Sequence, residues 1–267
     1  MAIRVCVAGV SGWTGSEVAR AILASDEFQL TGAIARRAAG RDAGDVLGVS
    51  STGLTVAATL AEALARPAEV LVDFTSPTSV RGRTLEALSG GVRVVVGTSG
   101  LTATDYAEID RAAVAAGLGV IAAGNFSVTA ALVKHFALIA AKLLPSREVI
   151  DYAGAGKPDA PSGTARELAE ALGAIGPGEL AVPIERTHGD PAARGAGVAG
   201  TRVHSVRLPG YNLAVEALFG LPHERLTIRH DAGSSPAPYV GGTLLAVRRV
   251  VHTVGLVRGL DTLLFGG

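Results

Sequence analysis

The sequence predicts an α/β protein: a doubly wound parallel sheet, plus a second α+β domain with a mixed or antiparallel sheet. Short continuous apolar runs alternate with segments of helical periodicity through the first 125 residues, a pattern typical of strands buried on both faces. A glycine-rich turn begins at Gly9, directly after the first apolar run. After residue 200, strand-like runs follow one another directly, which is typical of antiparallel pairing.

The first part of the chain contains five predicted strands. Strands are expected over residues 3–8, 28–35, 69–74, 92–96 and 119–122, and helices over 15–24, 60–64, 80–88 and 106–116. Parallel strands need long crossover connections, and these are usually helices that cover both faces of the sheet. This alternation therefore predicts a series of βα units.

The pattern changes after Asn125. Helices are expected over residues 128–144, 164–172 and 243–254, strands over 148–152, 201–207, 214–219 and 225–230, and loops over 153–161 and 176–199. The last helix is long and apolar enough to pack back on the first domain, which would make that domain discontinuous. The expected domains are residues 1–125 with 240–267, and residues 126–239.

Composition favours a cytoplasmic enzyme. The 24 Lys and Arg residues balance the 24 Asp and Glu residues, so no net charge attracts nucleic acid or an anionic membrane. The N-terminus lacks the layout of a signal peptide, and no apolar stretch approaches the roughly 20 residues of a membrane span. Cys6 is the only cysteine, which excludes an intrachain disulfide, and we expect it to be buried. Without a Cys/His cluster, no metal site is expected.

The turn after the first strand has the glycine spacing of a dinucleotide-binding site. Gly9, Gly12 and Gly15 lie between a predicted strand and a predicted helix. In such a turn one glycine permits the tight bend, the next lets the backbone approach a pyrophosphate, and the last lets the helix pack close to the strand. The sequence therefore predicts a Rossmann dinucleotide-binding domain. Thr14 and Trp13 lie within the turn, and Trp13 either shields the coenzyme or packs on the adjoining domain.

The end of the second strand favours NADPH over NADH, although either coenzyme stays open. NAD-selective sites usually place an acidic residue there to bind the ribose 2′-hydroxyl. Here Arg36 and Arg37 follow the strand, and the first acidic residue is Asp42. We expect the two arginines to hold a 2′-phosphate; otherwise they are solvated surface residues.

Several blocks of the chain resemble the dihydrodipicolinate (4-hydroxy-tetrahydrodipicolinate) reductase family. The blocks are the turn at 9–15, Asp73-Phe74-Thr75 with Pro77, residues 96–100, residues 124–127, residues 157–165 (Lys-Pro-Asp-Ala-Pro-Ser-Gly-Thr-Ala), residues 204–207 and residues 224–230. They occur in the family's order across nearly the whole chain. The resemblance implies a homotetramer, assembled through the sheets of the second domains, that reduces 4-hydroxy-tetrahydrodipicolinate with NAD(P)H in lysine and diaminopimelate biosynthesis.

The resemblance also implies roles for individual residues. Those implied to bind the coenzyme are Gly9, Gly12 and Gly15 at the pyrophosphate, Phe74, Thr75, Gly97 and Thr98 along the nicotinamide and its ribose, and Gly124, Asn125 and Phe126 beside the nicotinamide. Lys157 would be the catalytic proton donor, and Ser162, Gly163 and Thr164 would bind a substrate carboxylate. On local grounds alone, Lys157 reads as a surface lysine, and Ser162 is equally compatible with an ordinary N-cap.

The chain departs from the family motif just before Lys157. Ala153 and Gly154 occupy positions where the family usually carries paired histidines, and residues 208–216 also lack a usual histidine. Two enzyme hypotheses follow: reduction of 4-hydroxy-tetrahydrodipicolinate, or reduction of a different cyclic imine. A third hypothesis is a non-catalytic NADP-binding sensor or subunit. Either His204 or His230 is a candidate to line the substrate cleft.

Overall fold

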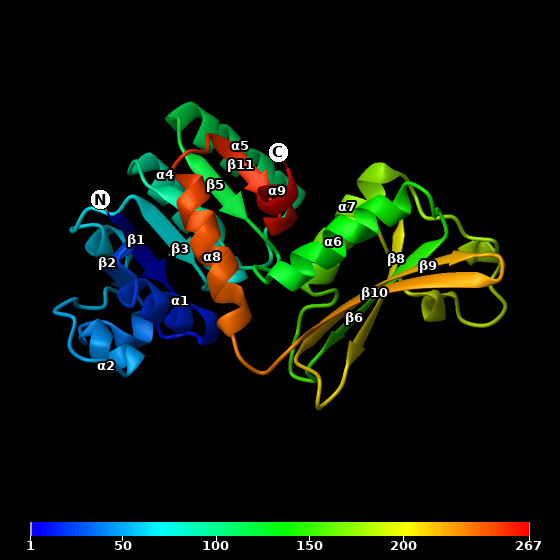
Figure 1. Ribbon diagram of the computed structural model, residues 1–267, viewed down its shortest axis with the longest axis horizontal. Coiled ribbons are helices and arrows are strands. Elements are labelled where there is room, and N and C mark those ends of the chain that lie inside the picture. Colours follow the sequence, from blue (N-terminus) through cyan, green and yellow to red (C-terminus); the bar gives the residue numbers. More distant parts are fainter. Residues whose placement is uncertain (1, 267) are drawn as a thin grey trace. The chain divides into compact units, whose positions relative to one another are not determined.

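A six-stranded parallel sheet forms the centre of the first of two units (Figure 1). The computed structural model describes residues 2–266. The first unit extends to Ser127 and resumes at Pro236. Its strands, in spatial order, are β2 (Phe28–Ile34), β1 (Ile3–Ala8), β3 (Val70–Asp73), β4 (Arg93–Val96), β5 (Gly119–Ala122) and β11 (Gly255–Arg258), and all neighbouring pairs are parallel.

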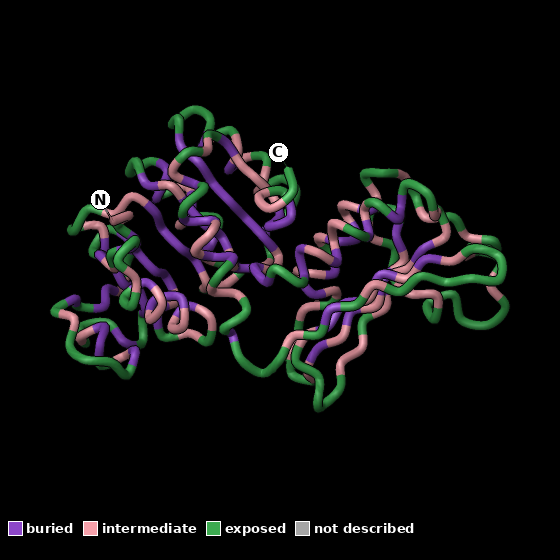
Figure 2. The backbone as a smooth tube through the Cα atoms, viewed as in Figure 1, coloured by how far each residue is buried: buried purple, intermediate pink, exposed green. Residues whose placement is uncertain are grey.

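Helices cover both faces of this sheet, which is why its central strands are buried along most of their length (Figure 2). On one face α1 (Trp13–Leu23) packs against α8 (Ala237–Val250). The other face is covered by α3 (Leu60–Ala63), α4 (Pro77–Ser89) and α5 (Ala103–Ala116). The shorter elements are a 3₁₀ turn (Arg36–Ala38), α2 (Ala43–Leu47) and α9 (Leu260–Phe265).

The local sequence sets the ends of these helices. The Thr102 side chain accepts the Asp105 N–H, and the Asp105 carboxylate accepts the Thr102 N–H, so α5 begins with a capping box. The helix ends at Gly117, whose φ of +64° is the left-handed conformation that glycine adopts without strain.

The strand order places a topological switch point between β1 and β3. The chain leaves β1 towards β2 at one edge and leaves β3 towards β4 in the opposite direction. In open parallel sheets, ligands bind outside the carboxyl ends of the strands at such a point. The turn after Ala8 and the segment after Asp73 meet here.

The second unit, Val128–Ser235, is built on a five-stranded mixed sheet. Its order is β10 (Glu224–Ala232), β9 (Leu213–Leu221), β6 (Arg147–Ala153), β8 (Thr201–Arg207) and β7 (Ala196–Val198). The β6–β8 pair is parallel and the other pairs are antiparallel.

Two helices cover one face of this second sheet. They are α6 (Val128–Ala141) and α7 (Gly163–Ile175), which pack on Val149, Val203 and Ala217. Along β6, buried and partly exposed residues alternate strictly, with Val149, Asp151 and Ala153 buried. Because strand side chains alternate between faces, these three side chains point to the same side of the sheet.

The predicted fold class is confirmed, and the errors lie in the boundaries and in the shortest elements. The helix expected over 243–254 spans Ala237–Val250, and β11 with α9 follows where helix and tail were expected. Pro236 and Pro238 lie at the start of this helix, where proline is favoured. The loop expected over 176–199 contains β7 and two 3₁₀ turns, Ile184–Arg186 and Pro191–Arg194.

Adjacent glycines in α8 provide a matched test of the packing of this helix. A Cβ added at Gly242 would lie 2.0 Å from the Phe126 carbonyl oxygen, whereas one added at Gly241 meets nothing within 4 Å. We expect Gly242→Ala to lower the free energy of unfolding by about 1–3 kcal/mol. Gly241→Ala should raise it by about 0.5–1 kcal/mol through helix propensity. Urea denaturation of both variants tests this, and equal effects would contradict the packing described.

Candidate active site

The glycine turn connects β1 to α1 at the switch point. Gly9 has a φ of +86°, and a Cβ there would lie 2.1 Å from the Phe74 carbonyl oxygen. A Cβ at Gly15 would lie 2.2 Å from the Gly9 carbonyl oxygen, so both positions require glycine for backbone packing. A Cβ at Gly12 would meet only the carbonyl oxygens of Gly9, at 3.1 Å, and of Phe74, at 3.9 Å. In the direction of a Cβ, Gly12 is therefore the least crowded of the three glycines.

Helix α1 begins without a side-chain cap. Gly12 is its N-cap residue and contributes no side-chain hydrogen bond. The N–H groups in the first turn of a helix have no intrahelical acceptor, and the helix dipole adds partial positive charge at this end. This terminus therefore has the chemistry of an anion site.

Phe74 joins four of the predicted coenzyme segments. Its carbonyl oxygen lies against Gly9, and a Cβ on Gly97 would lie 2.0 Å from its ring. The same ring makes an edge-to-face contact with Phe126, the centroids being 6.0 Å apart. Phe74, directly after β3, thus contacts residues that follow β1, β4 and β5 at one edge of the sheet.

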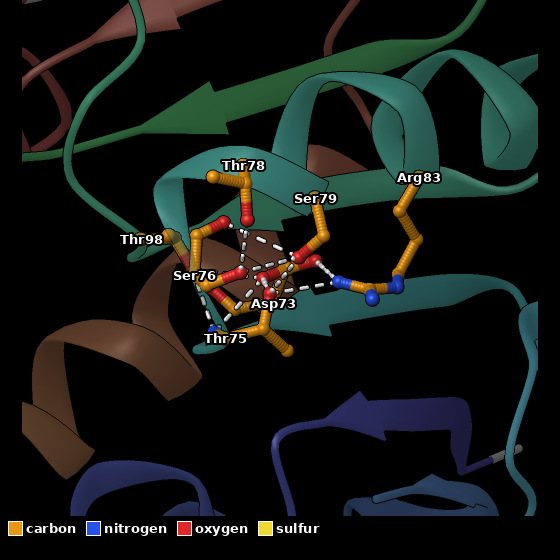
Figure 3. A network of polar contacts seen from close by, with 7 residues as sticks. All are labelled: Asp73, Thr75, Ser76, Thr78, Ser79, Arg83 and Thr98. Atoms are coloured by element: carbon orange, nitrogen blue, oxygen red, sulfur yellow. Dashed lines mark hydrogen bonds and ion pairs between the residues drawn. The ribbon is translucent and has the colours of Figure 1, made fainter. Parts of the chain in front are cut away.

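A buried carboxylate fixes the segments that follow β3 and β4 (Figure 3). Asp73 is completely buried, and its Oδ2 accepts a hydrogen bond of 2.6 Å from Arg83 Nη1. Its Oδ1 accepts hydrogen bonds from the hydroxyls of Thr75, at 2.6 Å, and Thr98, at 2.8 Å. The Thr75 N–H donates to the Thr98 hydroxyl at 2.7 Å. Two predicted coenzyme residues are therefore held by one ion pair.

Burial explains why Cys6 supplies no thiolate, although Arg83 of this network lies nearby. The Cys6 side chain is buried as expected, and burial raises the pKa of its thiol to about 12, more than the nearby Arg83 lowers it. The thiol is protonated at neutral pH and excluded from solvent, so it supplies no nucleophile.

Both arginines after β2 are exposed on the 3₁₀ turn that follows the strand. Asp42 caps α2: its Oδ1 accepts the N–H groups of Gly44, at 2.7 Å, and Thr52, at 3.0 Å. The Asp42 Oδ2 accepts from the Ser51 hydroxyl. Hydrogen bonds to backbone Thr52 and Gly44 hold the pKa of Asp42 below its usual range. Asp42, the first acidic residue after β2, therefore directs its carboxylate to hydrogen bonds within its own loop.

Trp13 and Thr14 open α1. The indole of Trp13 is 54% exposed and packs edge-on against Tyr239 of α8, with the ring centroids 5.8 Å apart. At the end of β5, Gly124 and Asn125 are partly exposed, and Asn125 Oδ1 accepts the Ser127 N–H at 2.8 Å.

In the second unit, Asp151 anchors the predicted substrate loop. Asp151 is completely buried in β6, and its two oxygens accept the Ser162 hydroxyl, at 2.6 Å, and the Ser162 N–H, at 2.8 Å. Ser162 is itself 1% exposed, and its Oγ also accepts the Ala165 N–H. The Ser162 side chain is thus turned inward as the N-cap of α7, whereas Gly163 and Thr164 in the first turn are partly exposed.

Lys157 lies between Asp151 and Ser162 in the sequence and is only partly exposed. Its ammonium group is 2.9 Å from Asp159 Oδ1. The Lys157 N–H donates to the Gly154 carbonyl at 3.0 Å, which forms a tight turn directly before the lysine.

The two positions that depart from the family motif differ in their surroundings. Ala153 is completely buried on the helix-covered side of β6. Gly154 is partly exposed, its N–H donates to the Asn212 carbonyl, and a Cβ there would lie 3.1 Å from the Tyr211 carbonyl oxygen. The packing leaves no room for an imidazole at position 153 without rearrangement.

Both histidine candidates contact polar side chains of the second unit. His230 is 5% exposed, its Nδ1 is 3.0 Å from the Thr129 hydroxyl, and burial lowers its pKa more than the neighbouring Asp231 raises it. His204 Nε2 lies 2.7 Å from Glu148 on the opposite face of the sheet from Val149. Among residues 2–266, no group of three or more His, Cys, Asp or Glu side chains is arranged to hold a metal ion.

Comparison with known proteins identifies the family. Residues 3–126 match the model of the dihydrodipicolinate reductase N-terminus, and residues 127–264 match that of the C-terminus. The chain belongs to the dihydrodipicolinate reductase family. It is 39% identical to 4-hydroxy-tetrahydrodipicolinate reductases from Desulfitobacterium hafniense (strain DSM 10664 / DCB-2) and Moorella thermoacetica, in each case over 98% of both chains. The resemblance inferred from the sequence motifs is confirmed.

Solved structures agree with this assignment. A dipicolinate-bound dihydrodipicolinate reductase from Paenisporosarcina sp. TG-14 is 30% identical, with a TM-score of 0.76 over 98% of this chain and 99% of that chain. An amine dehydrogenase from Mycobacterium smegmatis, 18% identical with a TM-score of 0.67 over 97% and 95% of the two chains, shares the fold.

Sequence reasoning missed the residues that hold these segments in place. Asp73 was noted only as part of a motif, and Arg83, Asp151 and Arg207 were given no role. An aspartate within or at the end of an apolar strand is a usable signal, because a buried carboxylate needs a cationic or hydrogen-bonding partner.

Removing the Asp73 carboxylate provides a test of the first network. We expect Asp73→Asn to lower the free energy of unfolding by about 3 kcal/mol, because it leaves Arg83, which is 18% exposed, without its partner. Glu108→Gln is the matched control: it breaks an ion pair between Glu108 of α5 and Arg81, which lies on α4 with Arg83, and both side chains of this pair are at least 36% exposed. That variant should differ little from the parent protein. Denaturant titration measures both, and similar losses would contradict the role of burial.

Proposed function

We propose that this chain is an NAD(P)H-dependent reductase that converts 4-hydroxy-tetrahydrodipicolinate to tetrahydrodipicolinate in lysine and diaminopimelate biosynthesis. The observation that carries the proposal is the uncapped start of α1 at the switch point of a parallel sheet. Full-length similarity to curated reductases of this substrate supports the choice of reaction. We further propose that the first unit binds the coenzyme and the second unit binds the substrate.

The residues of the first unit fit a dinucleotide. A Cβ at Gly12 would be less crowded than one at Gly9 or Gly15, and Gly12 begins α1 without a side-chain cap, which suits a pyrophosphate at the first turn of this helix. Phe74, Gly97 and Phe126 would form the wall next to the nicotinamide, with Thr75 and Thr98 near its ribose. When bound, the coenzyme supplies the hydride.

The residues of the second unit would supply the remaining chemistry. The conversion takes up one hydride and one proton, and the 4-hydroxyl group leaves as water. Lys157 is the proposed proton donor, because an ammonium on a short anchored loop supplies a proton from a fixed position. Gly163 and Thr164, at the start of α7, would bind a substrate carboxylate through the first turn of the helix. Dipicolinate, which is bound to the related reductase from Paenisporosarcina sp. TG-14, is likewise a dicarboxylate.

Substitution of Lys157 tests the proposed function. Lys157→Ala should lower kcat on freshly generated 4-hydroxy-tetrahydrodipicolinate by about 10²–10⁴-fold, the usual contribution of a positioned acid. Its Kd for NADPH should stay at the parent value. The exposed Lys142 provides the control, and Lys142→Ala should keep full activity. Nicotinamide absorbance gives the rate and fluorescence titration gives the affinity.

The same assay separates the alternatives. The small residues Ala153 and Gly154 favour a second candidate, a reductase of a cyclic imine with fewer carboxylates. Turnover of a simple cyclic imine but not of 4-hydroxy-tetrahydrodipicolinate would support that candidate. Coenzyme binding without turnover of any imine would indicate the sensor or subunit, and failure to bind either NADPH or NADH would exclude both enzymes.

NADPH is the proposed coenzyme. The exposed Arg36 and Arg37 follow β2, and the Asp42 carboxylate is engaged within its own loop. Replacing both arginines by alanine should weaken NADPH binding about tenfold for each lost contact to the 2′-phosphate, with NADH binding unchanged. Arg111→Ala, an exposed arginine on α5, is the control. Equal losses for the two coenzymes would contradict the assignment.

We propose a cytoplasmic homotetramer, assembled through the second-unit sheets, as the resemblance to the family implies. One face of that sheet carries α6 and α7. Among residues 2–266 no helix is long and apolar enough to span a membrane.

A further inference from the structure

A continuous set of polar contacts leads from the core of the second unit to Lys157. The Arg207 Nη2 donates to Asp151 Oδ2, at 2.7 Å, and to the backbone carbonyl of Asp159, at 2.6 Å. The Asp159 side chain in turn contacts the Lys157 ammonium group. Asp151, Lys157 and Asp159 are close in sequence, whereas Arg207 lies 48 positions after Asp159 and reaches them through the parallel pairing of β6 with β8.

At the core end of this set of contacts, Asp151 and Arg207 are extensively hydrogen-bonded. Asp151 is completely buried and also receives the hydroxyl and N–H of Ser162 and the hydroxyl of Ser205. Arg207 is 16% exposed, and its Nη1 donates to the Val206 carbonyl at 2.9 Å. A planar guanidinium with several donors can hold a carboxylate and a carbonyl at once, which lysine cannot reproduce with the same geometry.

The outer end of the set is the loop that carries Lys157. Residues 154–162 contain a tight turn before Lys157 and are tied to β6 through Ser162. Between Lys157 and Ser162, Arg207 of β8 donates a hydrogen bond to the Asp159 carbonyl and so attaches the loop to the sheet. Without it, the segment that presents the ammonium group would lose its central support.

We propose that Arg207, held by Asp151, is a positioning residue that fixes the Lys157 ammonium group through Asp159. The inference rests on the proposed role of Lys157 as proton donor. Arg207 acts on the rate only through the position of Lys157, so its loss changes kcat and leaves the coenzyme affinity of the first unit unchanged.

Arg207→Lys keeps the charge but removes the two-acceptor geometry. We expect kcat to fall about 10- to 100-fold, the cost of a misplaced catalytic group, with the Kd for NADPH unchanged. Arg202→Lys is the matched control, because Arg202 lies on the same strand and donates to the carbonyl of Gly195, in a different loop. The control should retain the parent kcat.

Asp159→Asn provides a second variant that leaves every contact between Arg207 and Asp151 in place. Its side chain is 34% exposed, so the fold should tolerate the change. We expect kcat to fall here too. If both residues act through one link, the double variant should be no slower than the slower single variant, whereas independent structural effects would multiply.

The outcomes distinguish this inference from the proposed function. If Lys157→Ala keeps the parent kcat, Lys157 is not the donor and the proposed function fails in that respect. If Lys157→Ala is slow but Asp159→Asn keeps the parent kcat, the inference alone is overturned. Multiplying effects of Arg207→Lys and Asp159→Asn would also overturn it. Should Arg207→Lys fail to fold, as judged by its melting temperature, Asp159→Asn decides the question.

Discussion

Each unit depends on a buried carboxylate that is neutralised by a single arginine. Asp73 pairs with Arg83 in the first unit, and Asp151 pairs with Arg207 in the second. Both aspartates lie near the carboxyl end of a central strand and are inaccessible to solvent. A buried charge is tolerated only when it is paired and its remaining lone pairs are hydrogen-bonded. The hydroxyl and N–H donors that meet this need come from the loops proposed to bind ligands, so stability and loop geometry have the same origin.

The two pairs stabilise chain segments that apolar packing cannot hold. Thr75 and Ser162 are polar residues of loops that leave a sheet edge. Hydrophobic burial is non-directional and fixes no particular loop conformation, whereas hydrogen bonds to a fixed carboxylate impose both distance and direction. Phe74 adds a directional apolar contact of its own, because Gly97 leaves space for its ring and Phe126 meets that ring edge-on.

The sequence predicts the β1 turn well because the constraint there is local: Gly9 and Gly15 contact each other within seven residues. The family motifs likewise indicated the segments around Lys157 and Ser162. The supporting pairs are harder to predict, since Arg207 is 56 positions from Asp151 and reaches it only through the β6–β8 register. The bounds of α8 are also hard to predict, because prolines stand at its start and the apolar run at its end continues into β11.

The position of β11 and α8 at the end of the chain has a consequence for biosynthesis. The first sheet receives its last strand, and one of its faces receives α8, only after the whole inserted segment Val128–Ser235 has been translated. At about 5–20 residues per second, this interval lasts several seconds or more. During it the nascent sheet exposes the apolar surface that α8 later covers, together with the unpaired edge of β5. Transiently exposed apolar surface and unpaired strand edges of this kind make a partly folded chain prone to aggregate.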